Sequence, residues 1–178
     1  SDLSQKGVDV ILNPSATHFA FNKFEIRKRY VLEGSRAFGV SYVHSNMRGN
    51  EAGRTIYDGG LLIASGGELL ACSQRFSFRV SQIVSAVIDV DKTRTQRSRL
   101  YGFNPDVAAD RSDCIAGDFD FPKIDPVSQT IALEAWELSP NLKEEEFTRA
   151  VSLGLADYLR KSRSHGFVVS LSGGADSS

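Results

Sequence analysis

The sequence predicts an α/β fold. Three observations predict it: an apolar run at residues 8–12 followed by a helical pattern, a series of further β-rich runs up to residue 90, and a late amphipathic helix that leads into an apolar run and a glycine-rich loop. Strands combined with helices in this way are typical of sheets covered by helices. The 178 residues suffice for one large domain or for parts of two.

The β-rich part begins with the strand predicted at residues 8–12, which ends at Asn-Pro-Ser. The helix predicted over residues 19–38 carries four cationic side chains: Lys23, Arg27, Lys28 and Arg29. Further strands are predicted over residues 40–46, 56–64, 68–76 and 80–90. A Ser-Gly-Gly turn at residues 65–67 supplies the glycines of a tight hairpin.

After this part the pattern changes. Residues 92–100 are basic and predict a short helix whose charges face solvent. Residues 102–140 have scattered Pro, Asp, Asn and Gly, which indicates a linker or a wrapping extension. Because irregular segments of this length are uncommon inside a compact domain, we expect a domain boundary here.

A clear helical pattern follows. Six residues fall on one face at spacings of three and four: Phe147, Val151, Gly154, Leu155, Tyr158 and Leu159. This face predicts packing against an apolar surface. Glutamates open the helix and basic residues close it, which matches the helix dipole. The helix leads into an apolar run at residues 167–171, predicted to be a buried strand, and this order is the opening of a doubly wound α/β domain.

The glycine-rich loop after that run predicts a polyphosphate site. Glycines let backbone N–H groups approach phosphate oxygens, hydroxyls add donors, and a carboxylate suits Mg²⁺. The candidate ATP-binding residues are Leu171, Ser172, Gly173, Gly174, Ala175, Asp176, Ser177 and Ser178, with Asp176 as the Mg²⁺ ligand and Ser172 as a candidate catalytic residue. The loop lacks Gly-Lys-Ser/Thr and is not a Walker A motif. Its Ser-Gly-Gly-x-Asp-Ser spacing resembles the pyrophosphate loop of ATP pyrophosphatases, and the alternative is a turn that merely ends a strand.

Composition excludes several partners. The chain is 41% apolar and 24% charged with a net charge of −1, and interspersed charges of both signs give no footprint for nucleic acid or an anionic membrane. No apolar stretch approaches the roughly 20 residues of a membrane span, and no signal peptide is evident, so we expect a cytoplasmic location. Cys72 and Cys114 lie far apart without C-x-x-C, which argues against a disulfide framework or a zinc site.

Three segments resemble one enzyme family. They are Asp-Val-Ile-Leu-Asn-Pro-Ser-Ala-Thr-His-Phe at residues 9–19, Tyr-Asp-Gly-Gly-Leu-Leu-Ile-Ala at 57–64, and Tyr-Leu-Arg-Lys-Ser-Arg at 158–163 ahead of the phosphate loop. They resemble glutamine-dependent NAD synthetase, and the resemblance covers nearly the whole chain. In that family a nitrilase-like glutaminase domain passes ammonia to a synthetase domain. The synthetase adenylates deamido-NAD with ATP, and ammonia then displaces AMP to give NAD.

The resemblance implies an internal fragment of such an enzyme. Residues 1–101 would form the C-terminal half of a nitrilase-like αββα sandwich and residues 102–140 the interdomain connection. Residues 141–178 would contribute the first helix and strand of a doubly wound, adenine nucleotide α-hydrolase-like synthetase domain. The implied ligands are glutamine, deamido-NAD, ATP and Mg²⁺, and the full-length protein would be a homo-oligomer. Because half a sandwich leaves an apolar sheet uncovered, we expect association or poor solubility of the chain alone.

The resemblance also assigns a glutamine site. Thr17 occupies the position of a hydroxyl near the glutamine backbone groups, and Lys23 that of a cation facing the α-carboxylate. Alternatively, Thr17 caps the following helix and Lys23 is one more solvated cation. His18 is expected to be a packing or capping histidine, and the Asp58-Gly59-Gly60 sequence is assigned a structural role.

The family's catalytic Glu, Lys and Cys would all precede Ser1, so we expect the isolated chain to be inactive. Cys72, in a predicted strand, is expected to behave as a small buried hydrophobe, and Cys114 has no base near it in sequence. Two other interpretations stay open: another pyrophosphate-loop ATP-dependent amidotransferase, or a non-catalytic phosphate-binding module. The upstream Asn-Pro-Ser-Ala-Thr-His and Tyr-Asp-Gly-Gly segments distinguish the first alternative from NAD synthetase.

Overall fold

The structure is a computed structural model, and it describes residues 2–100, 114–120, 122, 124–125, 131 and 133–175. Its elements are α1 (Asp2–Gln5), β1 (Val10–Ser15), α2 (Lys23–Phe38), β2 (Ser41–Asn46), β3 (Arg48–Glu51), β4 (Thr55–Asp58), β5 (Leu61–Ser65), β6 (Glu68–Cys72), α3 (Val90–Ser98), the 3₁₀ helix η1 (Ala135–Leu138) and α4 (Leu142–Ser162). The predicted α/β class is confirmed. None of the helices among the described residues has both the length and the apolar composition of a membrane span.

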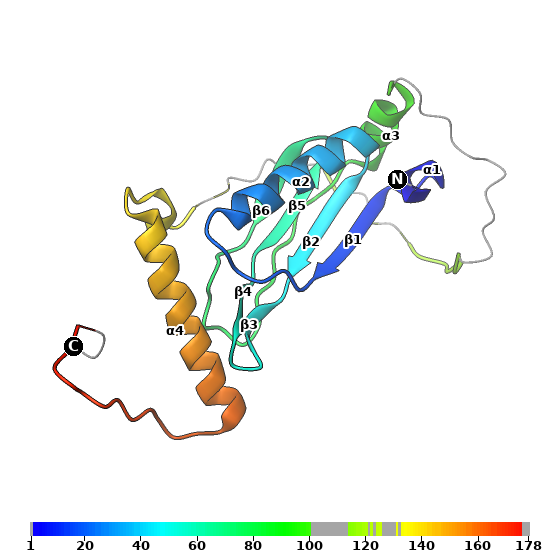
Figure 1. The fold of residues 1–178 in the computed structure, drawn as a ribbon. Coiled ribbons are helices and arrows are strands. Elements are labelled where there is room, and N and C mark those ends of the chain that lie inside the picture. Colours follow the sequence, from blue (N-terminus) through cyan, green and yellow to red (C-terminus); the bar gives the residue numbers. More distant parts are fainter. Residues whose placement is uncertain are drawn as a thin grey trace.

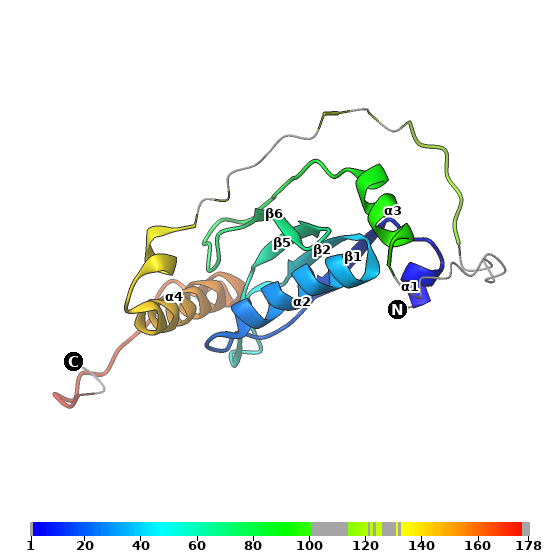
Figure 2. The same cartoon turned by 90° about the horizontal axis from the view of Figure 1, so that it is seen from above.

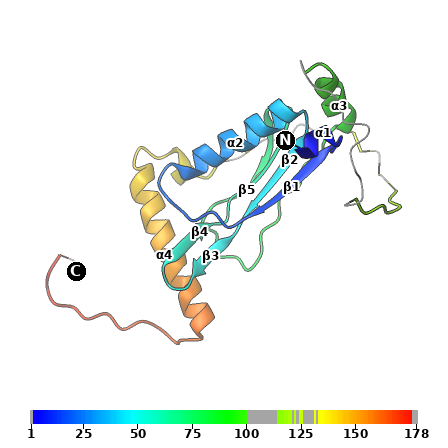
Figure 3. The same cartoon turned by 45° about the vertical axis from the view of Figure 1, so that its right-hand side comes forward.

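The main sheet has four strands in the order β1-β2-β5-β6, and a separate two-stranded sheet pairs β3 with β4. Strands β1 and β2 are parallel, whereas β5 is antiparallel to both of its neighbours. Helix α2 lies along one face of the main sheet (Figure 1). The β3–β4 hairpin extends beyond one end of that sheet and lies beside α4 (Figure 3).

A first apolar core forms between α2 and the main sheet. Phe24 and Val31 of α2 pack against Leu62 and Ala64 of β5. The helix ends at Gly39, which has a φ of 57° and donates its N–H to Arg36 O. A Cβ on Gly39 would lie only 2.6 Å from Cβ of Arg97, so this position combines a left-handed backbone with a close approach of α3.

A second core joins η1 and α4 to the β3–β4 end of the molecule. Its buried members are Phe76, Trp136, Ala150 and Leu153, and Phe19, Ile56 and Leu142 pack against them. Helix η1 lies within the segment predicted to be a linker, and its buried Trp136 ties that segment to the preceding sheet. Described residues on both sides of the predicted connection therefore share one packed core.

The predicted strand over residues 56–64 is divided in two. Gly59 has a φ of 72° and interrupts the strand between β4 and β5 without reversing its direction, since the residue pairs before and after it keep the same antiparallel register. As a result Tyr57 and Asp58 pair with β3, while Leu61 begins the strand that pairs with β2. The apolar pattern alone gave no signal of this change of sheet, although the two adjacent glycines mark where it occurs.

The predicted strand over residues 80–90 is wrong. This segment is irregular up to α3, and its residues alternate between exposed and half-buried. Figure 2 shows the segment on the side of the sheet opposite α2, so it lies against a face instead of extending the edge. Its first carbonyl, Val80 O, accepts a hydrogen bond from Arg48 Nη2 at 2.9 Å.

The basic helix predicted near residues 92–100 is confirmed as α3, but its charges are not all in solvent. Arg97 is buried and donates to Val8 O at 2.7 Å and to Asp9 Oδ1 at 3.0 Å. Arg94 also donates to Asp9, with Nη2 at 2.5 Å from Oδ2. Helix α3 is therefore held at the start of β1 by two arginines that share one carboxylate.

Helix α4 forms as predicted but packs with a different face. Its buried residues are Glu146, Ala150, Leu153, Gly154 and Asp157. Four members of the predicted apolar face are exposed: Phe147, Val151, Leu155 and Tyr158. The apolar spacing correctly predicted a helix, but polar residues with specific partners decide which side meets the β3–β4 hairpin.

Candidate functional site

The loop of residues 16–22 connects β1 to α2 at the carboxyl end of the parallel strand pair. In the register of that pair, Ser15 lies opposite Asn46, the last residues of their strands. Ligands of α/β sheets are commonly bound beyond the carboxyl ends of parallel strands. This loop contains Thr17 and ends at Lys23, the first residue of α2, so the structure brings both predicted glutamine contacts to one place.

Thr17 is held from several sides. Its backbone N–H donates to Asn46 Oδ1 at 2.9 Å, and its carbonyl accepts from Asn46 Nδ2 at 3.0 Å. Its Oγ1 lies 2.7 Å from Ser15 Oγ. Thr17 does not cap α2, because the N-cap of that helix is Asn22, in a left-handed conformation with no side-chain capping bond.

Lys23 is half-buried at the start of α2, and its Nζ lies 3.3 Å from Nε2 of the exposed His18. The N-terminal end of a helix carries a partial positive charge, to which Lys23 adds a full one. This end of the loop can therefore attract a carboxylate. The structure thus gives His18 a polar contact with Lys23, which sequence reasoning did not predict.

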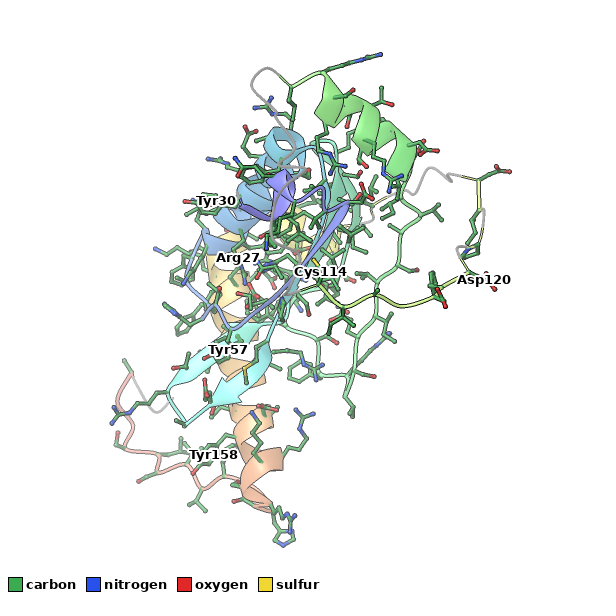
Figure 4. All side chains as sticks on the ribbon, turned by 90° about the vertical axis from the view of Figure 1, so that its right-hand side faces the viewer. Arg27, Tyr30, Tyr57, Cys114, Asp120 and Tyr158 are labelled. Carbon is green, nitrogen blue, oxygen red and sulfur yellow. The ribbon has the colours of Figure 1, made fainter. Side chains whose placement is uncertain are left out.

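A buried polar network lies beneath the loop. Asn46 Nδ2 donates to Asp58 Oδ1 at 2.9 Å, and Asp58 forms a buried ion pair with Arg27 of α2. Figure 4 shows Arg27 between α2 and the sheet, whereas Tyr30 lies on the outer side of the helix. Buried His44 lies nearby, and its pKa is lowered by burial and by the charge of Arg27, with Asp58 acting in the opposite direction.

Sequence reasoning missed this network as part of the site. One signal was present: Arg27 falls between Phe24 and Val31 on the sheet-facing side of α2, where a buried charge needs a partner. The structural role predicted for the Asp58-Gly59-Gly60 sequence agrees with the hydrogen bond from Gly60 N to Asp58 Oδ1 at 3.2 Å.

A separate cleft of about 500 Å³ lies between the start of α2, η1 and α4. Its wall includes Phe21 and Asn22 of the same loop, but neither Thr17 nor Lys23. At the cleft, Arg75 pairs with Glu137 at 2.8 Å and with Glu146 at 2.6 Å. Because these charges satisfy one another, the cleft offers a ligand fewer free polar groups than its size suggests.

Neither cysteine has the surroundings of a nucleophile. Cys72 lies in β6 and packs against the first core, as predicted. Burial raises the pKa of its thiol to about 11, so the reactive thiolate is scarce at neutral pH. Cys114 is exposed, and within the described residues no cluster of three His, Cys, Asp or Glu side chains surrounds it or any other position.

The predicted strand at residues 167–171 does not form. These residues are extended and exposed, and the red tail in Figure 1 leaves the end of α4 without returning to the main sheet. A strand needs a neighbour to pair its backbone groups, and none of the described elements lies beside this run.

In the phosphate loop, Gly173 has a φ of 75° and Gly174 N donates to Ser172 Oγ at 3.4 Å. The predictions for Asp176, Ser177 and Ser178 fall outside the described residues. The described part supplies glycine N–H groups suited to phosphate, in an exposed segment that other elements have not enclosed.

The described residues define a mixed α/β protein whose candidate site lies at the carboxyl ends of two parallel strands. No family model matches the chain. It is 32% identical over 178 residues to a glutamine-dependent NAD(+) synthetase of Oryza sativa subsp. indica, which covers 99% of this chain and 24% of the relative. It is 31% identical over 187 residues to a putative glutamine-dependent NAD(+) synthetase of Schizosaccharomyces pombe, covering 99% of this chain and 25% of the relative.

Solved structures agree. A crystal structure of a glutamine-dependent NAD(+) synthetase from Cytophaga hutchinsonii matches 98% of this chain and 21% of that chain, with 41% identity and a TM-score of 0.65. The enzyme of Acinetobacter baumannii in complex with adenosine diphosphate has a TM-score of 0.65 over 99% of this chain and 26% of its own, and its 21% identity supports the fold alone.

The resemblance predicted from the motifs is therefore confirmed: the chain is similar, over nearly its whole length, to glutamine-dependent NAD synthetases. It spans about a quarter of the length of the curated relatives that it matches.

Proposed function

We propose that the chain is part of a glutamine-dependent NAD synthetase, an amide ligase that converts deamido-NAD to NAD. ATP would activate the nicotinate carboxyl as an adenylate, and ammonia released from glutamine would displace AMP. The observation that carries this proposal is the 41% identity to the Cytophaga hutchinsonii enzyme over 98% of the chain. The loop at the carboxyl ends of β1 and β2 supports it, since both predicted glutamine contacts lie there.

In this proposal, residues 1–101 belong to the second half of a nitrilase-like glutaminase domain, residues 102–140 connect it to the synthetase, and residues 141–178 begin the synthetase domain. One helix-covered sheet of the expected αββα sandwich is consistent with the first part. The docking of η1 and α4 on the second core supports a connection that returns to the glutaminase side before the synthetase begins. The full-length protein is proposed to be a homo-oligomer.

Thr17 and Lys23 would hold the α-amino acid end of glutamine. The Lys23 ammonium, at the positive end of α2, suits the α-carboxylate. The Thr17 hydroxyl would hydrogen-bond the adjacent polar groups of the ligand. Glutamine hydrolysis also requires a thiolate nucleophile, and the surroundings of Cys72 argue against its serving as one. We therefore assign the nucleophile to residues other than these 178 and expect the isolated chain to release no ammonia from glutamine.

The segment from Leu171 to Ser178 would bind the phosphates of ATP, and Asp176 would ligate Mg²⁺, which supplies charge neutralisation when bound. Ser172 would donate its hydroxyl to a phosphate oxygen. For the Gly174 N–H to bind phosphate as well, it would first release the hydrogen bond that it donates to Ser172 Oγ. The glycine N–H groups then become available to the leaving pyrophosphate.

The test uses the full-length protein that contains this segment. NAD formation is measured from deamido-NAD and ATP with Mg²⁺, with either glutamine or ammonium as the nitrogen source. Formation with both sources supports the proposal. Transfer of ammonia to a different carboxylate would indicate another pyrophosphate-loop amidotransferase, and phosphate binding without turnover would indicate a non-catalytic module; either result would contradict the assignment.

A further inference from the structure

The side chain of Asn46 makes three hydrogen bonds to two neighbours, and these bonds use both of its N–H donors. Its Oδ1 accepts from Thr17 N at 2.9 Å, and its Nδ2 donates to Thr17 O at 3.0 Å and to Asp58 Oδ1 at 2.9 Å. Asn46 is buried at the end of β2, its bond to Asp58 is enclosed, and its two bonds to Thr17 are partly buried. One amide therefore pairs with the backbone of Thr17 much as a neighbouring strand would.

Asp58 continues the network to α2. Its side chain is only 1% exposed, and its second oxygen, Oδ2, forms the ion pair with Arg27. Arg27 lies one helical turn after Lys23, on the same helix. The path from Thr17 thus reaches Lys23 through the bonds of the Thr17 backbone to Asn46, two buried side-chain contacts (Asn46–Asp58 and Asp58–Arg27) and one turn of helix.

The charge of Asp58 fixes which way the amide points. An ionised carboxylate only accepts hydrogen bonds, so Asn46 must turn its NH₂ group toward Asp58 and its oxygen toward Thr17 N. A flipped amide would place its oxygen against the acceptor oxygens of Asp58 and Thr17 O, and its NH₂ group against the Thr17 N–H donor. The orientation of the Thr17 backbone is therefore imposed by a carboxylate that does not touch it.

We propose that Asn46 and Asp58 are positioning residues for glutamine, and that they set the Thr17 hydroxyl and the Lys23 ammonium at a fixed separation before the ligand binds. This inference rests on the proposed glutamine site. A loop ordered in advance loses less conformational entropy on binding, so disruption of the pair weakens glutamine binding while the chemical step proceeds once the ligand is in place.

The test compares N46A with wild type in the full-length protein. We expect KM for glutamine to rise about tenfold in N46A, the equivalent of about 1.4 kcal/mol for the lost hydrogen bonds, while kcat changes much less. The matched control is N13A, on the neighbouring strand. Asn13 donates to Tyr42 Oη at 2.9 Å, between two strands of the main sheet, so its loss should leave KM for glutamine within about twofold.

A second variant, N46D, gives a readout that a general loss of stability would not. It places two carboxylates opposite each other, which raises the apparent pKa of the pair. Arg27 on α2 is ion-paired with Asp58, and His44 on β2 interacts electrostatically with both, whereas Arg48 of β3 donates to the carbonyls of Ser77 and Val80. As the pH falls from 8 to 6, a proton restores a donor at position 46. The KM of N46D relative to wild type should then decrease, whereas the ratio for N46A stays constant.

The outcomes separate the two proposals. If wild type does not hydrolyse glutamine, the proposed function fails. If wild type does hydrolyse it and N46A keeps the wild-type KM, or N13A raises KM equally, the positioning role is overturned. If N46A does not fold, the test uses N46D, whose KM for glutamine relative to wild type should decrease as the pH falls from 8 to 6. A ratio that does not change with pH also overturns the inference.

Discussion

Arg75 Nη1 lies 2.6 Å from Glu146 Oε1, and this contact joins the segment after β6 to α4 across 71 positions of sequence. The guanidinium also lies 4.5 Å from the ring centroid of Phe24 and 4.8 Å from that of Trp136. Both charged side chains are almost fully buried. A charge so enclosed is tolerated because carboxylates and aromatic faces replace its water.

Removal of the Glu146 carboxylate should therefore destabilise the chain. In E146A we expect the free energy of unfolding to fall by about 3 kcal/mol, at the low end for breaking a buried pair, because Arg75 keeps Glu137. Urea denaturation measures this. The matched control is E145A, whose half-exposed pair with Arg149 on the same helix should contribute only about 0.5 kcal/mol. Equal losses in the two variants would contradict this account of α4 docking.

The sequence correctly predicted the elements whose signals lie within a short stretch of chain. The strand at β1, the helix α2, the β5–β6 hairpin and the basic helix α3 all lie where periodicity, turn glycines and charge placed them. The failures concern pairing with distant residues. The apolar segment 80–90 has strand-like alternation but lies on a sheet face, and the run 167–171 has no neighbouring strand among the described elements. Periodicity cannot say which partner supplies the backbone hydrogen bonds.

The candidate site was predictable only in part. Motif resemblance indicated Thr17 and Lys23, and the structure places Thr17 on the loop after β1 and Lys23 at the start of the helix that this loop leads into. It could not indicate Asn46, because a single asparagine at the end of an alternating strand carries no signal until the register sets it opposite Ser15 and its amide meets the backbone of Thr17. The docking face of α4 was missed for a similar reason. Asp157 and Glu146 look like surface residues in sequence, and only their partners Asn50 and Arg75 explain their burial.

Gly49 should not tolerate a side chain. It has a φ of 104°, and a Cβ there would overlap the Asp157 carboxylate, which accepts the N–H of Asn50 at 2.8 Å. In G49A we expect a loss of about 2–3 kcal/mol in the free energy of unfolding, from backbone strain and the displaced carboxylate. Thermal or urea denaturation measures it. Gly53 is the control: its φ is 67°, but a Cβ would approach only the ring of Tyr158, at 3.7 Å. G53A should therefore cost less, and the reverse order would contradict the proposed clash.

The exposed apolar face of α4 should make the chain self-associate. Phe147, Val151, Leu155 and Tyr158 follow one another at spacings of three and four and are all exposed. Lysine forms helices nearly as well as leucine, so L155K should keep the helix and weaken association about tenfold. Sedimentation velocity measures the effect. S152K adds the same charge at an exposed position outside this face and is the control. Equal weakening of association in both variants would mean that the added charge, and not the loss of this apolar face, causes the effect.

His44 should make stability depend on pH near neutrality. Burial, and then the charge of Arg27, lower its pKa below the ordinary 6.5, so the folded state favours the neutral imidazole. Because the unfolded chain then binds a proton more readily, the contribution is complete above pH 6.5 and is lost as the pH falls through that value toward the lower pKa of the folded state. Urea denaturation between pH 7.5 and 5 should therefore show a decline in the free energy of unfolding that H44Q reduces. The control, H165Q, changes an exposed histidine of the tail and should retain the decline. An unchanged slope in H44Q would mean that the decline arises from other groups.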